Sequence, residues 1–152
     1  MKLKISNSLF FALVAIVVNF SNPVLAASNS EDEIKAVISK IYDKPYHKVV
    51  TTPVAVVDKF AIADWTQGNR GGRALMKKIN GKWAIAACGA DGFKDIKNLE
   101  DAGIPTKTAE QLIKKLTKLE KSIDPARVHL FSLFGTKDDP KNIEEHHSHH
   151  EH

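Results

Sequence analysis

Five of the chain's seven histidines lie within its last seven residues. They are His146, His147, His149, His150 and His152, and three glutamates flank them, Glu144, Glu145 and Glu151. Imidazole nitrogen binds Cu(II), Zn(II) and Ni(II), and closely spaced histidines on a flexible segment can converge on one ion. Cu(II) stands at the top of the divalent affinity order for such ligands. The segment is therefore predicted to bind copper. A purification tag is the alternative, although Ser148 and Glu151 interrupt the histidine run.

Cys88 is the single cysteine of the 152-residue chain, which excludes an intramolecular disulfide and any metal site made of cysteines alone. In an oxidising compartment a lone cysteine is either buried and inert or used for metal or redox work. Cys88, His47 and Met76 are weaker copper-ligand candidates than the C-terminal histidines, with the soft thiol and thioether suited to Cu(I).

The N-terminus has the organisation of a signal peptide over residues 1–26. Lys2 and Lys4 form a positive region, an apolar stretch from Leu9 to Val18 follows, and Val24-Leu25-Ala26 offers small residues for cleavage. About ten apolar residues are too few for a helix that crosses ~30 Å of hydrocarbon. The protein is therefore expected to be exported. Loss of Lys2 and Lys4 lowers the net charge from +4 to +2, which does not suggest a nucleic-acid binder.

Hydrophobic periodicity predicts a helix followed by a four-stranded sheet. Ser30 and Glu33 form a capping box before an apolar stripe with helical spacing, and Pro45 ends that helix. Period-two patterns then predict strands over 54–57, 60–67, 73–79 and 82–88. Asn80-Gly81 is a strong hairpin signal, and connections this short require an antiparallel meander.

Three further helices are predicted after the sheet. The first covers 95–102, the second begins with a cap at Thr106 or Thr108, and the third begins at Asp124-Pro125 and closes at Gly135. The polar stretch 136–152 has no periodicity and is predicted to be a disordered tail. The fold class is therefore α+β: one domain over 27–135, in which an N-terminal helix and C-terminal helices pack on the antiparallel sheet.

The hairpin turns fix which residues face each other across the strands. A two-residue turn at Asn80-Gly81 pairs Arg73 with Cys88, and one at Gly68-Asn69 pairs Asp64 with Arg73. Asp64, Arg73 and Cys88 would then share one face of the sheet. An ion pair beside a buried thiol is the simplest interpretation of that row.

The same registration places two tryptophans, a methionine and an isoleucine on the opposite face, where they are predicted to be core. These residues are Trp65, Trp83, Met76 and Ile85. Met76 would accordingly lie away from Cys88, which weakens it as a shared copper ligand.

The sequence contains no motif that is typical of a known class of enzyme. The sequence lacks a Ser/His/Asp order, a paired-carboxylate motif and a cofactor fingerprint, so the protein is expected not to be an enzyme. The glycine-rich stretch 67–73 joins two predicted strands and lacks the helix N-terminus that phosphate loops use.

A set of short motifs runs along the chain: Tyr42-Asp43-Lys44-Pro45 with His47-Lys48-Val49, Ala63-Asp64-Trp65 with Gln67-Gly68, Arg70-Gly71-Gly72-Arg73-Ala74-Leu75, Trp83-x-Ile85, Cys88-Gly89, Leu133-Phe134-Gly135-Thr136 and Asp138-Asp139-Pro140. Together these motifs resemble those of the copper uptake system-associated proteins, a family of small exported bacterial proteins. The resemblance spans about the whole chain after residue 26. It implies a periplasmic accessory to copper acquisition and assigns no site residues.

The leading hypothesis is a periplasmic copper-binding accessory that holds or passes copper near an uptake system. The alternative is a module that binds a small molecule or a protein partner, with an incidental tail.

Overall fold

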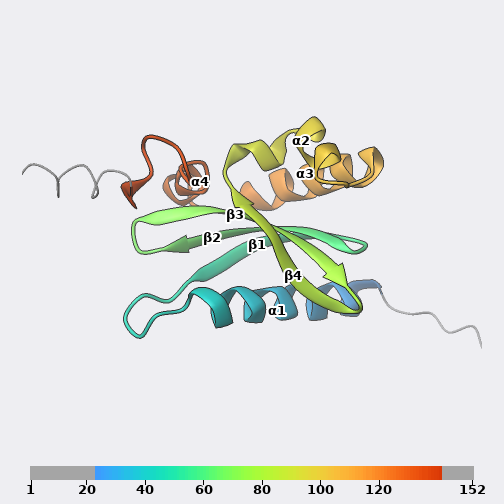
Figure 1. Ribbon diagram of the computed structural model, residues 1–152, viewed down its shortest axis with the longest axis horizontal. Helices are drawn as coiled ribbons and strands as arrows, with labels where there is room; N and C mark the ends of the chain where they lie inside the picture. Colours follow the sequence, from blue (N-terminus) through green and yellow to red (C-terminus); the bar gives the residue numbers. More distant parts are fainter. Residues whose placement is uncertain (1–22, 142–152) are drawn as a thin grey trace, which may run out of the picture.

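A computed structural model describes residues 23–141, with side chains from Asn29 onward. A four-stranded antiparallel sheet lies between two helical layers, with α1 on one face and α2, α3 and α4 on the other (Figure 1). The α+β meander predicted from the sequence is confirmed. Within the described residues, none of the helices is both long enough and apolar enough to cross a membrane.

The sheet follows chain order, β1-β2-β3-β4, with β1 Val50–Val57, β2 Phe60–Gln67, β3 Arg70–Ile79 and β4 Lys82–Gly89. The Asn80-Gly81 turn has positive φ at both residues, 50° and 78°, as a tight turn between twisted strands requires. Strand β1 begins four residues earlier than predicted and is irregular between Thr51 and Val54. Strand β3 begins three residues earlier, so Arg70 belongs to the sheet.

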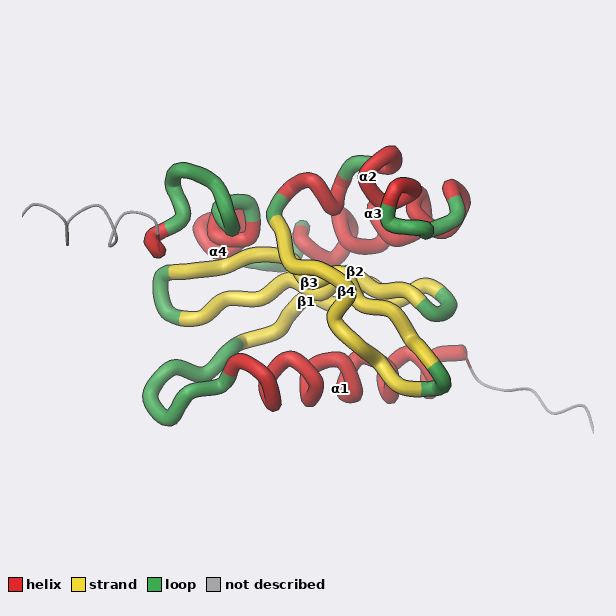
Figure 2. Tube along the Cα trace, viewed as in Figure 1, coloured by secondary structure: helices red, strands yellow, loops and turns green. Residues whose placement is uncertain are grey.

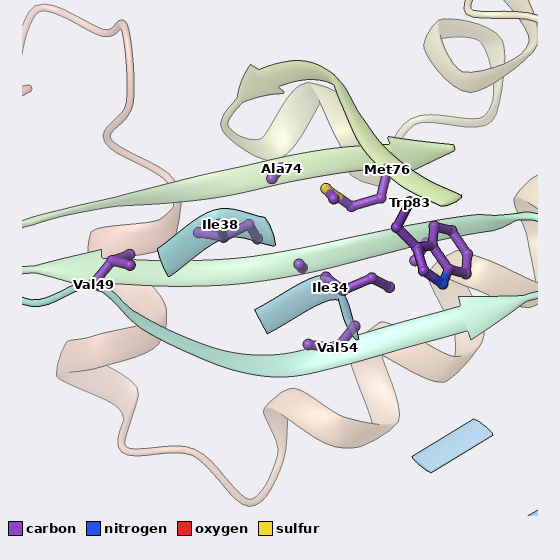
Figure 3. Packing of buried hydrophobic residues seen from close by; sticks show 9 residues of the cluster. Ile34, Ile38, Val49, Val54, Ala74, Met76 and Trp83 are labelled. Carbon is purple, nitrogen blue, oxygen red and sulfur yellow. The ribbon is translucent and has the colours of Figure 1, made fainter. Parts of the chain in front are cut away.

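The first helical layer is α1, Pro23–Tyr42. Ile34 and Ile38 are buried against Val54, Met76 and Trp83 of the sheet, as Figure 3 shows. Ser30 lies inside α1, so the prediction that it caps the helix is wrong. The predicted signal peptide falls outside the described residues, except for Pro23–Ala26 at the start of α1.

The second layer contains a 3₁₀ turn at Asp91–Lys94, α2 at Ile96–Asp101, α3 at Thr106–Glu120 and α4 at Pro125–Phe131. Apolar residues of α2 and α3 pack on one part of the sheet, with Leu99, Leu112 and Leu116 against Ile62 and Leu75.

Helix α4 begins as predicted, because Asp124 caps it through the Ala126 amide and Pro125 occupies the first helical position. It ends at Phe131, earlier than the predicted Gly135. Helix α3 begins at Thr106, but neither threonine caps it, because its N-cap is Pro105.

The segment after α4 differs from the prediction of a tail that is disordered from residue 136. Residues 136–141 fold back on the sheet, and Asp139 is only 5% exposed. The reason is an ion pair with Arg70, which the polarity of the segment does not reveal. The remaining residues 142–152, with the five C-terminal histidines, lie outside the described part.

Candidate functional site

A cavity of about 130 Å³ lies where α1 ends, between the sheet and the segment after α4. Three aromatic rings, an aliphatic side chain, a thiol, an amide and a guanidinium line it: Tyr42, Val49, Trp65, Gln67, Arg70, Cys88 and Phe134. The Trp65 and Phe134 rings meet edge to face, with centroids 5.6 Å apart. The cavity walls are mainly apolar, so it suits an aliphatic or aromatic group.

Cys88 reaches this cavity because the pairing of β3 with β4 shifts by one residue. The pairs Met76–Ile85 and Leu75–Ala87 leave Ala86 as an extra residue, and such a bulge moves every later side chain to the other face. Cys88 therefore pairs with Ala74 and packs on the α1 side. The predicted row of Asp64, Arg73 and Cys88 is wrong at Cys88, since two-residue turns cannot reveal a bulge inside a strand.

The Cys88 thiol lies beside the Tyr42 hydroxyl, with 3.9 Å between Sγ and the phenolic oxygen. Burial raises the pKa of Cys88, and the nearby Cys88 raises the pKa of Tyr42. The thiol is therefore protonated at neutral pH. A metal ion that binds it must displace the proton, which lowers affinity as the pH falls.

His47 lies on the loop between α1 and β1, beside the cavity residue Gln67. The Gln67 amide fixes this loop, donating hydrogen bonds to the carbonyl oxygens of Tyr42 at 2.8 Å and His47 at 2.7 Å. The loop and the segment after α4 lie on either side of the β2–β3 turn (Figure 2). The His47 side chain is exposed to solvent.

The segment after α4 rests on the Arg70-Gly71-Gly72-Arg73 stretch of β3. Arg70 Nε lies 3.2 Å from Asp139 Oδ1, and Asp139 Oδ2 accepts the Gly135 amide at 3.0 Å. A Cβ at Gly71 would lie 2.9 Å from the Leu130 backbone, and one at Gly72 would lie 2.8 Å from Phe134 Cβ. The glycines permit close approach of α4 and its extension. This stretch therefore seats the C-terminal segment.

Arg73 is the centre of a buried charged cluster between the sheet and α4. Its guanidinium contacts Glu120 at 2.8 Å, Asp91 at 2.7 Å and the Phe131 carbonyl at 3.0 Å. Arg73 also pairs with Asp64, as predicted, with 3.3 Å between Nε and Oδ1. Arg73 is 1% exposed and Asp64 is fully buried.

The two buried carboxyl groups of this cluster differ in acidity. Burial raises the pKa of Asp64 to about 8 despite the charge of Arg73, and the nearby Glu120 adds to the rise. Neither Asp64 oxygen has a hydrogen-bond partner among the described residues, and the 3.3 Å contact with Arg73 is poorly aligned. Burial opposes ionisation of Glu120 too, but hydrogen bonds from Lys94 and Arg73 keep its pKa below the ordinary value. Asp64 is thus the group that holds a proton at neutral pH.

Of the other predicted copper ligands, Met76 lies in the described part, whereas the C-terminal histidines lie outside it. Met76 is fully buried in the α1-side cluster, where Trp65, Trp83 and Ile85 also pack, as predicted. Cys88 packs on that same cluster, so the prediction that it faces away from Met76 is wrong. Within residues 23–141, no three His, Cys, Asp or Glu side chains are grouped so as to hold a metal ion.

Comparison of the chain with protein-family models, curated proteins and solved structures gave no match.

Sequence reasoning missed Tyr42, Phe134 and Glu120 as site residues. All three come from helices or loops far along the chain from the strands they contact. Only Glu120 could have been suggested from the sequence, because it ends a helix whose apolar stripe faces the sheet. Asp64 and Arg73 were found because a short turn fixes their pairing.

Proposed function

We propose that this protein is a periplasmic accessory of copper uptake that holds or passes copper through its C-terminal histidines. The observation that carries the proposal is the donor set, five imidazoles and three carboxylates within residues 144–152. This set suits Cu(II) better than the other common divalent ions. The resemblance to copper uptake system-associated proteins supports the same function and the periplasmic location.

The fold supports the proposal through the place where this segment leaves the domain. Asp139 is fixed to Arg70, and the next described residues lead to Lys141, five positions before His146. The donor segment is therefore attached at one defined edge of the domain. Cys88 lines a cavity together with Arg70, and the His47 backbone is bonded to Gln67 of the same cavity, so these are the residues to which copper could be passed.

Titration with Cu(II) tests this function. A variant with alanine at all five C-terminal histidine positions should bind Cu(II) at least about tenfold more weakly than the wild type, since its imidazole ligands are gone. The matched control replaces His47 and His129, the two histidines of the described domain, and should keep the wild-type affinity. Unchanged affinity in the quintuple variant would show that the C-terminal histidines are not the site.

Affinity should also fall as the pH drops through about 6.5, because only neutral imidazole binds the metal. The quintuple variant should lack this dependence.

A second candidate, a binding module for a small apolar molecule, is favoured by the cavity beside Cys88. Such a ligand would quench or shift the fluorescence of Trp65 in a Trp83→Phe background. Saturable binding of that kind in the quintuple variant would favour this function over copper handling.

A further inference from the structure

The cavity beside Cys88 has the size and polarity for one apolar side chain. An apolar protein cavity of about 150 Å³ accommodates a benzene-sized group, and this one measures about 130 Å³. Trp65, Phe134 and Val49 provide its apolar walls. An isoleucine, leucine or phenylalanine side chain would fit it.

The described chain ends beside this cavity. Arg70 lines the cavity and is paired with Asp139, and Lys141 follows two residues later. Asp139 is further fixed by the amides of Gly135 and Lys141, at 3.0 and 3.1 Å. The next residues of the chain therefore start from a fixed point at the cavity's edge.

After Lys141 the sequence has one apolar residue followed by two acidic residues, which suits an apolar cavity beside positive charge. Within 142–152, Ile143 is the only apolar side chain, and it stands two positions after Lys141. Two residues of extended chain span at most about 7 Å. Glu144 and Glu145 come directly after it.

Positive charge lies on the loop that adjoins the cavity. Lys44 and Lys48 are exposed on the loop between α1 and β1, whose ends Tyr42 and Val49 line the cavity. Lys48 lies 3.3 Å from Asp43, and two lysines against this one carboxylate leave the loop with net positive charge. An acidic pair of side chains that crosses the cavity would meet these lysines.

We propose that the C-terminal segment docks across this cavity, with Ile143 inserted beside Cys88 and Glu144 and Glu145 facing Lys44 and Lys48. Ile143 in the cavity would add a second contact to the Arg70–Asp139 ion pair. It would also bring His146 toward Cys88 and His47. The docking requires no copper, so it stands or falls separately from the proposed function.

The rate at which Cys88 reacts with an aromatic disulfide reagent measures the docking, because Cys88 is the chain's single thiol and lines the cavity. The full chain is used, with a chelator present to remove copper. Ile143→Asp should raise the rate about fivefold to tenfold, since a charged side chain does not enter an apolar cavity. Ile143→Leu should leave the rate near that of the wild type.

The matched control is Ile79→Asp, at an isoleucine that is 58% exposed in the β3–β4 hairpin and outside the cavity lining. It should not change the rate. Replacing both Glu144 and Glu145 with lysine should raise the rate, and more at low ionic strength than at high, because exposed charges are screened by salt.

Three results would overturn the proposal. One is an unchanged rate in Ile143→Asp. Another is a rate rise of equal size in Ile79→Asp. The third is protection of Cys88 that increases with protein concentration, which would assign the cavity to the segment of a second copy.

Discussion

The two faces of the sheet are covered by helices in different ways. On the α1 face the buried contacts are mainly apolar, with Ile34 and Ile38 packed on Met76 and Trp83. On the other face, α2 and α3 also pack through apolar residues, but α4 and its extension are held by charged groups. The buried Arg73 and the half-buried Arg70 make those contacts.

This difference shows what each attachment depends on. Apolar packing is nondirectional and independent of pH, so α1 should stay docked wherever the chain folds. Buried ion pairs need matched geometry and the right protonation, and loss of one partner is costly. The half of the molecule that leads to the C-terminal histidines is therefore the half that charge and pH control.

Removal of Arg73 should have the largest effect on stability. Arg73→Met leaves the ionised Glu120 without its buried cation and the Phe131 carbonyl without a donor, at a cost of about 3–5 kcal/mol in the free energy of unfolding. The control is Met76→Leu, at an equally buried position on the α1 face, which should cost less than about 1.5 kcal/mol. Urea unfolding measures both, and equal costs would remove the contrast between the two faces.

Gly71→Ala should come second. The added Cβ would lie 2.9 Å from the Leu130 backbone, which cannot move without displacing α4. We expect a loss of about 1–3 kcal/mol and faster hydrogen exchange in α4 than in α1. Gly92→Ala is the control, because its nearest contact is the Asn98 side chain at 3.4 Å. Uniform exchange rates in α1 and α4 of Gly71→Ala would contradict the close-approach role.

The pH dependence of stability should follow Asp64. Its pKa is raised from 3.8 to about 8 by burial, so between those values the folded protein binds a proton that the unfolded chain has released. Stability from this proton is fully present below about pH 4 and is lost as the pH rises toward 8. Glu120 has a lowered pKa and acts in the opposite sense only in the acid range.

Asp64→Asn keeps the size and shape of the side chain but cannot ionise. The free energy of unfolding of this variant should therefore fall less steeply as the pH rises. Between about pH 5 and pH 8.5 the wild type should lose at least about 1 kcal/mol more in its free energy of unfolding than the variant does. If the free energy of unfolding changes with pH in the same way for both proteins, Asp64 ionises with an ordinary pKa.

The smallest effect should come from Asp139→Asn. Its partner Arg70 is 33% exposed, so the ion pair contributes at most about 1 kcal/mol. Hydrogen bonds from Gly135 and Arg70 outweigh burial and keep the pKa of Asp139 below its usual value. The substitution should speed hydrogen exchange at the Gly135 amide, while Asp138→Asn, at its exposed neighbour, should not.

The fold could be predicted largely from local signals. Asn80-Gly81, Asp124-Pro125 and the period-two stretches each act over a few residues, and the sheet order follows from short connections. The α1 start was not predictable from Ser30, because the helix continues through a capping box when the preceding residues are also helical. The ion pair of Arg70 with Asp139, 69 positions apart, left no local pattern.

The candidate site was predictable only in part. Cys88 was identified by its residue type, but its face was set by the bulge at Ala86, which depends on how the whole of β4 fits the sheet. Tyr42 and Phe134 reach the cavity through tertiary packing. The pairing of Asp64 with Arg73 was correct because no bulge intervenes between β2 and β3.

The electron paramagnetic resonance spectrum of the protein with one equivalent of Cu(II) tests the central claim most directly. Copper held by the C-terminal histidines should show coupling to imidazole nitrogens in the wild type, and the quintuple histidine-to-alanine variant should lose it. The His47→Ala and Cys88→Ser variants should keep the wild-type spectrum. The same nitrogen-coupled spectrum in the quintuple variant would contradict the proposed function and place copper in the folded domain.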